Sequence, residues 1–150
     1  GCSFAENAKI KSSYGFNKFN IPCFADDSGI CIEALNWKPN IFSNKFIEGF
    51  NSYNDCFKYV FKRIKKTKKN NAFFKTSVCL TLKKDYHIVF EGKISGTISK
   101  DIRGNNGFGY DPIFIPDGSK KTFAEMSSLS KNSFSHRSIA INKLINFLSN

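Results

Sequence analysis

A run of alternating residues over 72–82 constrains the fold of this chain more than any other segment. One parity of the run is mostly apolar, and the other mixes polar and apolar side chains. Side chains along an extended strand point alternately to its two faces, so this period of two predicts a long β-strand. Two segments that follow, 87–91 and 93–99, carry β-branched and aromatic residues on either side of Gly92. They predict antiparallel neighbours of that strand or one long bent ribbon.

Three segments with helical spacing accompany these strands. A capping box that begins at Ser3 predicts a helix over 4–14, which Gly15 ends. A second cap at Ser52 precedes an amphipathic helix, and a third helix is expected over 135–148. A chain of 150 residues has the length of one domain, so strands and helices together predict a single α/β domain.

The chain is strongly basic, with 23 Lys and Arg against 12 Asp and Glu and a net charge of +11. Such a charge suits a polyanionic partner, which includes nucleic acids, anionic membranes and nucleoside triphosphates. Six of the eight residues over 62–69 are basic and fall at the end of a predicted helix. Basic residues there complement the negative end of the helix dipole, and this interpretation is favoured over a nucleic-acid patch.

The cysteines and the hydropathy pattern exclude several classes of protein. The five cysteines are odd in number and form no C-x-x-C pair, which argues against a disulfide framework and a zinc site. No apolar run is long enough to span a bilayer, and the first residues lack a secretory apolar region. The sequence therefore predicts a cytoplasmic protein without a membrane partner.

Two acidic residues follow a short predicted strand over 23–25. Asp26 and Asp27 lie with Ser28 and Gly29 in a predicted turn, after which an extended pattern resumes. Adjacent carboxylates leaving a strand point to opposite faces, so one of them is expected to enter a site. That carboxylate can bind a hard cation or take a proton from water that attacks a phosphate. The alternative is a polar turn whose Asp side chains bond to their own backbone.

A loop over 103–112 is too rich in Gly and Asn for regular structure and too aromatic for a linker. Its glycines permit close backbone approach, and Phe108 and Tyr110 can stack on a planar ring. The carboxylate of Asp111 can accept hydrogen bonds from the edge of a base. The loop thus suits a purine pocket, and its alternative is a surface loop closed by its own aromatic side chains.

Polar side chains gather where the last predicted helix begins. His136 and Arg137 follow Ser135 at that point, and Lys131 comes shortly before. Helix-terminal amides already favour an acceptor or an anion, and the two side chains can both donate to a carbonyl oxygen. The alternative is an ordinary polar first turn.

Taken in order, these segments resemble the motifs of the inosine triphosphate pyrophosphatase family, the Ham1 family. The matching residues are Phe4-Ala5-Glu6-Asn7-Ala8 with Lys11, Ala25-Asp26-Asp27-Ser28-Gly29, Gly107-Phe108-Gly109-Tyr110-Asp111-Pro112-Ile113-Phe114, Ala124-Glu125-Met126, Lys131-Asn132 and Ser135-His136-Arg137. The resemblance extends over essentially the whole chain. It implies an elongated α/β fold, in which a mixed, twisted sheet is flanked by helices in two lobes with the site in the cleft between them.

The resemblance also implies an activity. Members of the family hydrolyse noncanonical purine nucleoside triphosphates (ITP, dITP and XTP) to the monophosphate and pyrophosphate with Mg²⁺, usually as homodimers and without a stable nucleic-acid partner. By resemblance, Asp27 is the proton acceptor and a metal ligand, and Lys11 reaches toward the phosphates. The residues implied to contact substrate are Ser28, Phe108, Gly109, Tyr110, Asp111, Lys131, His136 and Arg137.

The chain also departs from the family pattern. Asn40 stands where the family commonly has Gly, and it tolerates the left-handed conformation that Gly supplies. The family's first strand, its phosphate-binding loop and an upstream metal-binding Glu have no counterpart, so the domain is expected to be incomplete at its N-terminus and poorly active as given. The alternative function is a non-catalytic basic module that binds nucleotides or nucleic acid.

Overall fold

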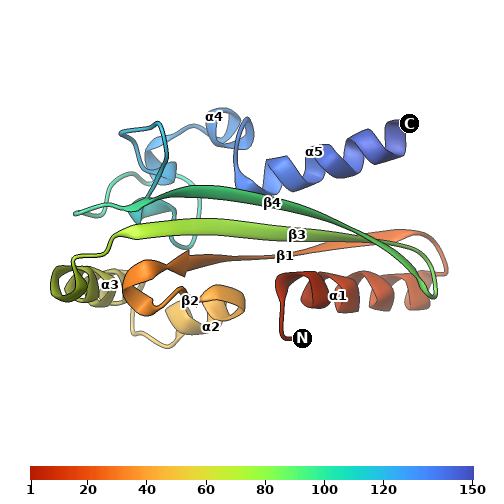
Figure 1. Ribbon diagram of the computed structural model, residues 1–150, viewed down its shortest axis with the longest axis horizontal. Coiled ribbons are helices and arrows are strands. Elements are labelled where there is room, and N and C mark those ends of the chain that lie inside the picture. Colours follow the sequence, from red (N-terminus) through yellow and green to blue (C-terminus); the bar gives the residue numbers. More distant parts are fainter. The chain divides into compact units, whose positions relative to one another are not determined.

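The computed structural model describes all residues from 1 to 150 (Figure 1). The helices are α1 (Phe4–Phe19), α2 (Ser43–Glu48), α3 (Tyr53–Thr67), α4 (Ser128–Asn132) and α5 (His136–Ser149). The strands are β1 (Cys23–Ile32), β2 (Lys38–Pro39), β3 (Asn71–Lys83), β4 (Tyr86–Ile98) and β5 (Phe114–Pro116). The strands form one sheet in the order β2-β1-β3-β4-β5, which confirms the predicted α/β class. None of the helices combines the length and apolar character needed to cross a bilayer.

By its internal contacts the chain divides into two compact units. The first comprises residues 1–28, 75–93 and 134–150, and the second comprises residues 29–74 and 94–133. The strands β1, β3 and β4 each contribute residues to both units.

In the first unit, α1 and α5 cover opposite faces of β3. Leu80 belongs to a buried apolar cluster with Ala140 and Leu144 of α5. The next residue, Thr81, shares a hydrogen bond with Ser12 of α1, with their hydroxyl oxygens 2.7 Å apart. Successive side chains of a strand point to opposite faces, so the two helices lie on different sides of the strand, as Figure 1 shows. This arrangement explains why β3 is buried on both faces over 76–81.

Helix α1 begins as predicted but ends later. The hydroxyl of Ser3 accepts a hydrogen bond from the backbone N–H of Glu6 at the N-cap. The predicted end at Gly15 is wrong, since the helix continues to a left-handed Asn20. Glycine inside a helix costs only about 1 kcal/mol, and a Cβ on Gly15 would lie 3.2 Å from the side chain of Cys23. Gly15 therefore allows close packing against β1 instead of ending the helix.

The predicted turn at residues 26–29 is also wrong, because β1 runs unbroken through them. Asp side chains favour such a turn when they bond to the local backbone. In the structure, Asp26 bonds to a side chain of α5 and Asp27 bonds to side chains of α1. These tertiary bonds favour an extended backbone through the acidic pair.

The later elements largely agree with the sequence. The segment 86–98 is one long strand, so the single-ribbon alternative is confirmed. Ser52 caps α3, as predicted, and the last helix, expected over 135–148, is α5 with Ser135 as its N-cap. The segment 37–53, for which the sequence predicts no helix or strand, contains β2, a 3-10 turn and α2. No cysteine forms a disulfide.

The core of the second unit is aromatic. Phe74 and Phe114 meet edge to face with ring centroids 4.8 Å apart, and Phe114 lies 5.1 Å from Phe123. These three side chains are almost fully buried. At Gly96 a Cβ would lie 2.2 Å from the carbonyl oxygen of Ile115, so only glycine permits β5 to pair this closely with β4.

Candidate active site

In the first unit, both oxygens of the Asp27 carboxylate bond to side chains of α1. Oδ2 accepts a hydrogen bond of 2.9 Å from Nδ2 of Asn7, and Oδ1 lies 2.7 Å from Nζ of Lys11. Asn7 and Lys11 are one helical turn apart, so α1 presents both to the same point. The Asp27 side chain is 16% exposed, which leaves it within reach of a ligand. The geometry suits an oriented carboxylate that binds a cation or accepts a proton.

Asp26 belongs to a separate network on the other side of β1. Its Oδ2 accepts hydrogen bonds from Nε and Nη2 of Arg137, at 3.2 and 3.1 Å. The same oxygen accepts a bond of 3.0 Å from the hydroxyl of Ser28, which also bonds to the hydroxyl of Thr76. The network therefore joins β1, β3 and α5, and it brings the predicted residues Ser28 and Arg137 together.

The start of α5 lies directly against β4. A Cβ on Gly92 would lie 1.9 Å from the carbonyl oxygen of His136 and 2.8 Å from the amide nitrogen of Ala140. Residue His136 is buried, with 7% of its surface exposed. Gly92 therefore allows the first turn of α5, which carries His136 and Arg137, to pack closely against β4.

In the second unit, the Asp111 carboxylate organises the glycine-rich loop. Its Oδ2 accepts hydrogen bonds from Nζ of Lys131 at 2.5 Å and from the backbone N–H of Phe108 at 3.0 Å. The side chains of Asp111 and Lys131 are 4% and 15% exposed, so this is a shielded ion pair. Gly107 has a φ of +74°, and a Cβ there would lie 2.0 Å from the same carboxylate oxygen. The loop therefore folds around a buried charge, and both of these bonds engage Oδ2 of Asp111.

Tyr110 anchors the glycine-rich loop from a buried position. It is 4% exposed, and its hydroxyl donates a hydrogen bond of 2.9 Å to the carbonyl oxygen of Ser43. Burial raises the pKa of the Tyr110 hydroxyl, and the neighbouring Cys56 raises it further. Burial likewise raises the pKa of the Cys56 thiol to about 11. A buried ring has little face to offer a base, so Tyr110 positions the loop.

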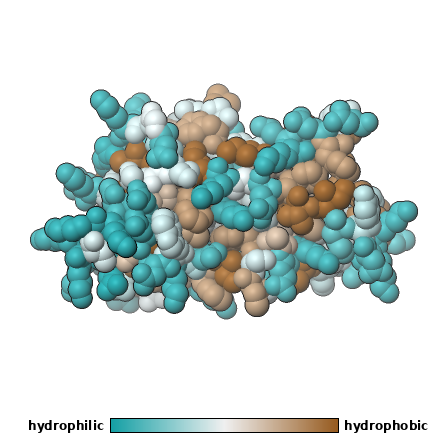
Figure 2. All heavy atoms as spheres, viewed as in Figure 1, coloured by the Kyte–Doolittle hydropathy of each residue, from teal (hydrophilic) through white to brown (hydrophobic).

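Phe108 has the opposite environment. Its side chain is among the most exposed aromatic groups, at 68%, and Nζ of Lys131 lies 4.9 Å from the centre of its ring. Exposure alone does not mark a site, because Tyr14, Phe24 and Leu129 are each at least 60% exposed and hydrophobic residues recur over the face shown in Figure 2. Phe108 differs from these residues in the cation beside its ring and in the glycines on either side of it.

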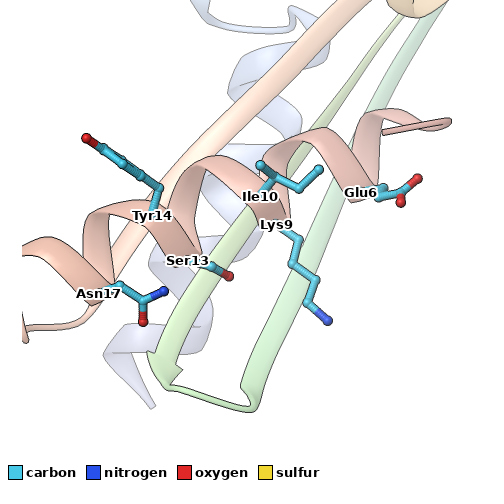
Figure 3. A pocket seen from close by; sticks show the side chains of 6 residues that line it. All are labelled: Glu6, Lys9, Ile10, Ser13, Tyr14 and Asn17. Carbon is cyan, nitrogen blue, oxygen red and sulfur yellow. The ribbon is translucent and has the colours of Figure 1, made fainter.

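A shallow pocket on α1 has no part in either group of residues. Its lining residues all come from this helix (Figure 3): Glu6, Lys9, Ile10, Ser13, Tyr14 and Asn17. Asn7 and Lys11, which hold Asp27, do not line it. The pocket therefore lies on a different face of α1 from the side chains that meet the carboxylate.

Three contact residues of the first unit escaped the functional predictions. Asn7 holds Asp27, Asp26 holds Arg137, and Thr76 supports Ser28. The spacing of Asn7 and Lys11 on one helix face is a signal that points to a shared target. No comparable signal links Thr76 to Ser28, since they lie 48 residues apart.

The chain has few prearranged metal ligands. No group of three or more His, Cys, Asp or Glu side chains is arranged to hold a metal ion. Mg²⁺, however, is commonly held by one or two carboxylates together with substrate phosphates and water. Asp27, as an oxygen donor within reach of a ligand, fits this second mode.

Comparisons with known proteins agree with one another. The model of the Ham1 family matches residues 1–147. A dITP/XTP pyrophosphatase of Flavobacterium psychrophilum is 40% identical over 96% of this chain and 75% of its own length. That of Aquifex aeolicus is 35% identical over all of this chain and 78% of its own.

Solved structures show the same relationship. A HAM1 protein from Coxiella burnetii superposes with a TM-score of 0.91 at 32% identity, over 99% of this chain and 78% of its own. The Ham1 protein of Staphylococcus aureus gives a TM-score of 0.87 at 35% identity, with the same two coverages. Both the sequence and the fold of the chain are therefore similar to these proteins.

Proposed function

The chain belongs to the Ham1 family, and we propose that it hydrolyses the noncanonical purine nucleotides ITP, dITP and XTP to monophosphate and pyrophosphate. The observation that carries this proposal is the carboxylate of Asp27, oriented by Asn7 and Lys11, in a chain 35–40% identical to dITP/XTP pyrophosphatases over nearly its whole length. The activity is that of a nucleoside triphosphate pyrophosphatase.

Asp27 is the proposed general base. Its carboxylate accepts a proton from a water molecule, whose oxygen forms a bond to the α-phosphorus as the bond to pyrophosphate breaks. Asn7 keeps the carboxylate oriented during this step, and Lys11 supplies positive charge beside the phosphates. We propose Mg²⁺ as the cofactor, held by Asp27 and the substrate phosphates, where it would neutralise phosphate charge.

The second group of residues is proposed to hold the base. Phe108 stacks on the purine, between glycines that allow close backbone approach at Gly107 and Gly109. Asp111, oriented by Lys131, accepts a hydrogen bond from a ring N–H through Oδ1. Tyr110 contributes by anchoring this loop.

His136 and Arg137 are proposed to determine which purine base the site accepts. Hypoxanthine and xanthine carry a 6-oxo acceptor where adenine carries an amino donor. Donors aimed at that position are left unpaired against adenine, which costs about 1–3 kcal/mol for a buried group. ITP is therefore preferred to ATP.

Pyrophosphate release tests the proposal directly. The purified chain is incubated with ITP, dITP, XTP and ATP in Mg²⁺ and, as a control, in a chelator. We expect one pyrophosphate for each monophosphate formed, with ATP the poorest substrate and no turnover in chelator. Hydrolysis that releases inorganic phosphate instead would contradict the proposed reaction.

The competing function is a basic module that binds nucleic acid without turnover. Its support is the basic end of α3, where Lys62, Lys65 and Lys66 are exposed. These residues also lie where the helix dipole favours cations, so the helix explains them without a partner. Tight binding of single-stranded RNA with no pyrophosphate release would favour this alternative.

We further propose that the protein acts as a homodimer in the cytoplasm, where nucleoside triphosphates are made and used. Support for the dimer is the family resemblance. Light scattering during size-exclusion chromatography measures the mass directly, and twice 17.0 kDa is expected.

A further inference from the structure

The contacts around Arg137 have a defined hydrogen-bond direction. The hydroxyl of Ser28 donates its only proton to Oδ2 of Asp26. The hydroxyl of Thr76 must then donate to Ser28, since Ser28 has no second proton. Thr76 is fully buried in β3, so the chain of bonds from Thr76 through Ser28 to Asp26 starts at a rigid point.

This chain of bonds ends on the guanidinium of Arg137. Nε and Nη2 both donate to the single oxygen Oδ2 of Asp26, and Nη2 also donates to Ser28 at 3.3 Å. Contacts to two nitrogens of a planar group fix both its position and its plane. Nη1 is the nitrogen that neither Asp26 nor Ser28 engages.

The pair has little value as a stabilising ion pair. The side chains of Asp26 and Arg137 are 38% and 44% exposed. Ion pairs exposed to this degree are screened by solvent and contribute little to stability. The contact with Asp26 instead orients the guanidinium of Arg137.

We propose that Asp26 is a positioning residue that holds the Arg137 guanidinium in the orientation required to recognise the 6-oxo group of a purine. The inference rests on the proposed function, in which Arg137 distinguishes ITP from ATP. Without Asp26, the guanidinium samples other rotamers, and fewer enzyme molecules present it correctly to the base.

The test compares the ratio of kcat/KM for ITP to kcat/KM for ATP in the parent, Asp26→Ala, Arg137→Ala and the double variant. A partly misfolded sample lowers both rates together and leaves the ratio unchanged, so the ratio reports positioning. Asp85→Ala is the matched control, because it removes another exposed carboxylate, in the turn before β4, for which no side-chain bond is found.

We expect Asp26→Ala to lower the ratio at least fivefold, with Asp85→Ala unchanged. The double variant should match Arg137→Ala, because residues that act as one unit are not additive. Asp26→Asn, which keeps the side-chain volume, is expected to lower the ratio as well. If Asp26→Ala does not fold, Asp26→Asn takes its place in the test.

Different failures have different meanings. If Arg137→Ala lowers the ratio and neither Asp26 variant does, the positioning role is refuted while the proposed function stands. Additive losses in the double variant refute the role as well. If the parent does not prefer ITP, or if Arg137→Ala leaves the ratio unchanged, both the proposed base recognition and the inference about Asp26 are refuted.

A measurement on the free protein is independent of turnover. In NMR spectra, the Nε–H of Arg137 should give a resolved, slowly exchanging signal in the parent and in Asp85→Ala. In Asp26→Ala this signal should be lost to exchange with water. A signal that persists unchanged would overturn the inference.

Discussion

Asp26 and Asp27 are consecutive residues of β1, yet their carboxylates bond to different helices. Asp26 accepts hydrogen bonds from Arg137 of α5, whereas Asp27 accepts them from Asn7 and Lys11 of α1. The alternation of a strand separates the two side chains, and the helices cover opposite faces of the neighbouring β3. One pair of acidic residues can thus serve two tasks, chemistry at Asp27 and positioning at Asp26.

Asp27→Asn is expected to abolish most hydrolysis without unfolding the chain. The amide keeps the volume of the carboxylate but cannot accept the proton, and removing a general base typically costs about 10²–10⁴ in rate. Pyrophosphate release measures the rate, and circular dichroism checks the fold. A variant that retained most of the parental kcat would exclude Asp27 as the base.

Lys11→Met should reduce kcat/KM for ITP by roughly tenfold or more, the cost of about 1.4 kcal/mol of lost charge interaction. Lys9→Met is the matched control, since Lys9 lies two residues away on α1 and forms no ion pair. Steady-state kinetics of both variants provide the comparison. Equal losses in both would indicate a general charge effect in place of a contact with Asp27.

Gly92→Ala should displace the first turn of α5. The added methyl would lie 1.9 Å from the carbonyl oxygen of His136, a distance that backbone atoms cannot tolerate. Overpacking of this kind costs about 1–3 kcal/mol, and the ITP preference should fall because Arg137 moves with the helix. Thermal unfolding and the ITP/ATP ratio measure the two effects. Unchanged stability and preference together would show that α5 does not depend on this close approach.

Tyr110→Phe should loosen the base loop. It removes the hydroxyl that donates a buried hydrogen bond to the carbonyl of Ser43, at a cost of about 0.5–1.5 kcal/mol. Both the unfolding free energy and the affinity for inosine should decrease. Tyr86→Phe, at an exposed tyrosine of β4, is the control and should change neither.

Alkaline pH should destabilise the chain in part through Cys56. Its thiol has a folded pKa of about 11 against an ordinary value of 9.0, so the folded state retains the proton that the unfolded state loses. The stabilisation is complete below pH 9 and is lost as the pH rises toward 11, by up to about 3 kcal/mol. Chemical denaturation at pH 8–11 measures this loss. The decline should be shallower in Cys56→Ala and unchanged in Cys2→Ala, at the exposed cysteine.

Some site features were readable from the sequence because they are local or periodic. The face separation of Asp26 and Asp27 follows from strand alternation, and the irregular loop around Gly107 follows from its glycines. Asn40 adopts the expected left-handed conformation, with a φ of +57°. The failures, at Gly15 and at the turn of 26–29, occurred where packing against another element outweighed a local preference.

The helix caps, the long strands and the family of the chain can be read from the sequence alone. A cap bond, such as that between Ser3 and the N–H of Glu6, closes within three residues, so local order is enough to specify it. Which helix bonds to which carboxylate depends on the packing of the folded chain. Arg137 reaches Asp26 across 111 residues and Lys11 reaches Asp27 across 16. The periodicity of a strand predicts that the side chains of Asp26 and Asp27 point to opposite faces. The packing of the whole core determines which helix covers each face.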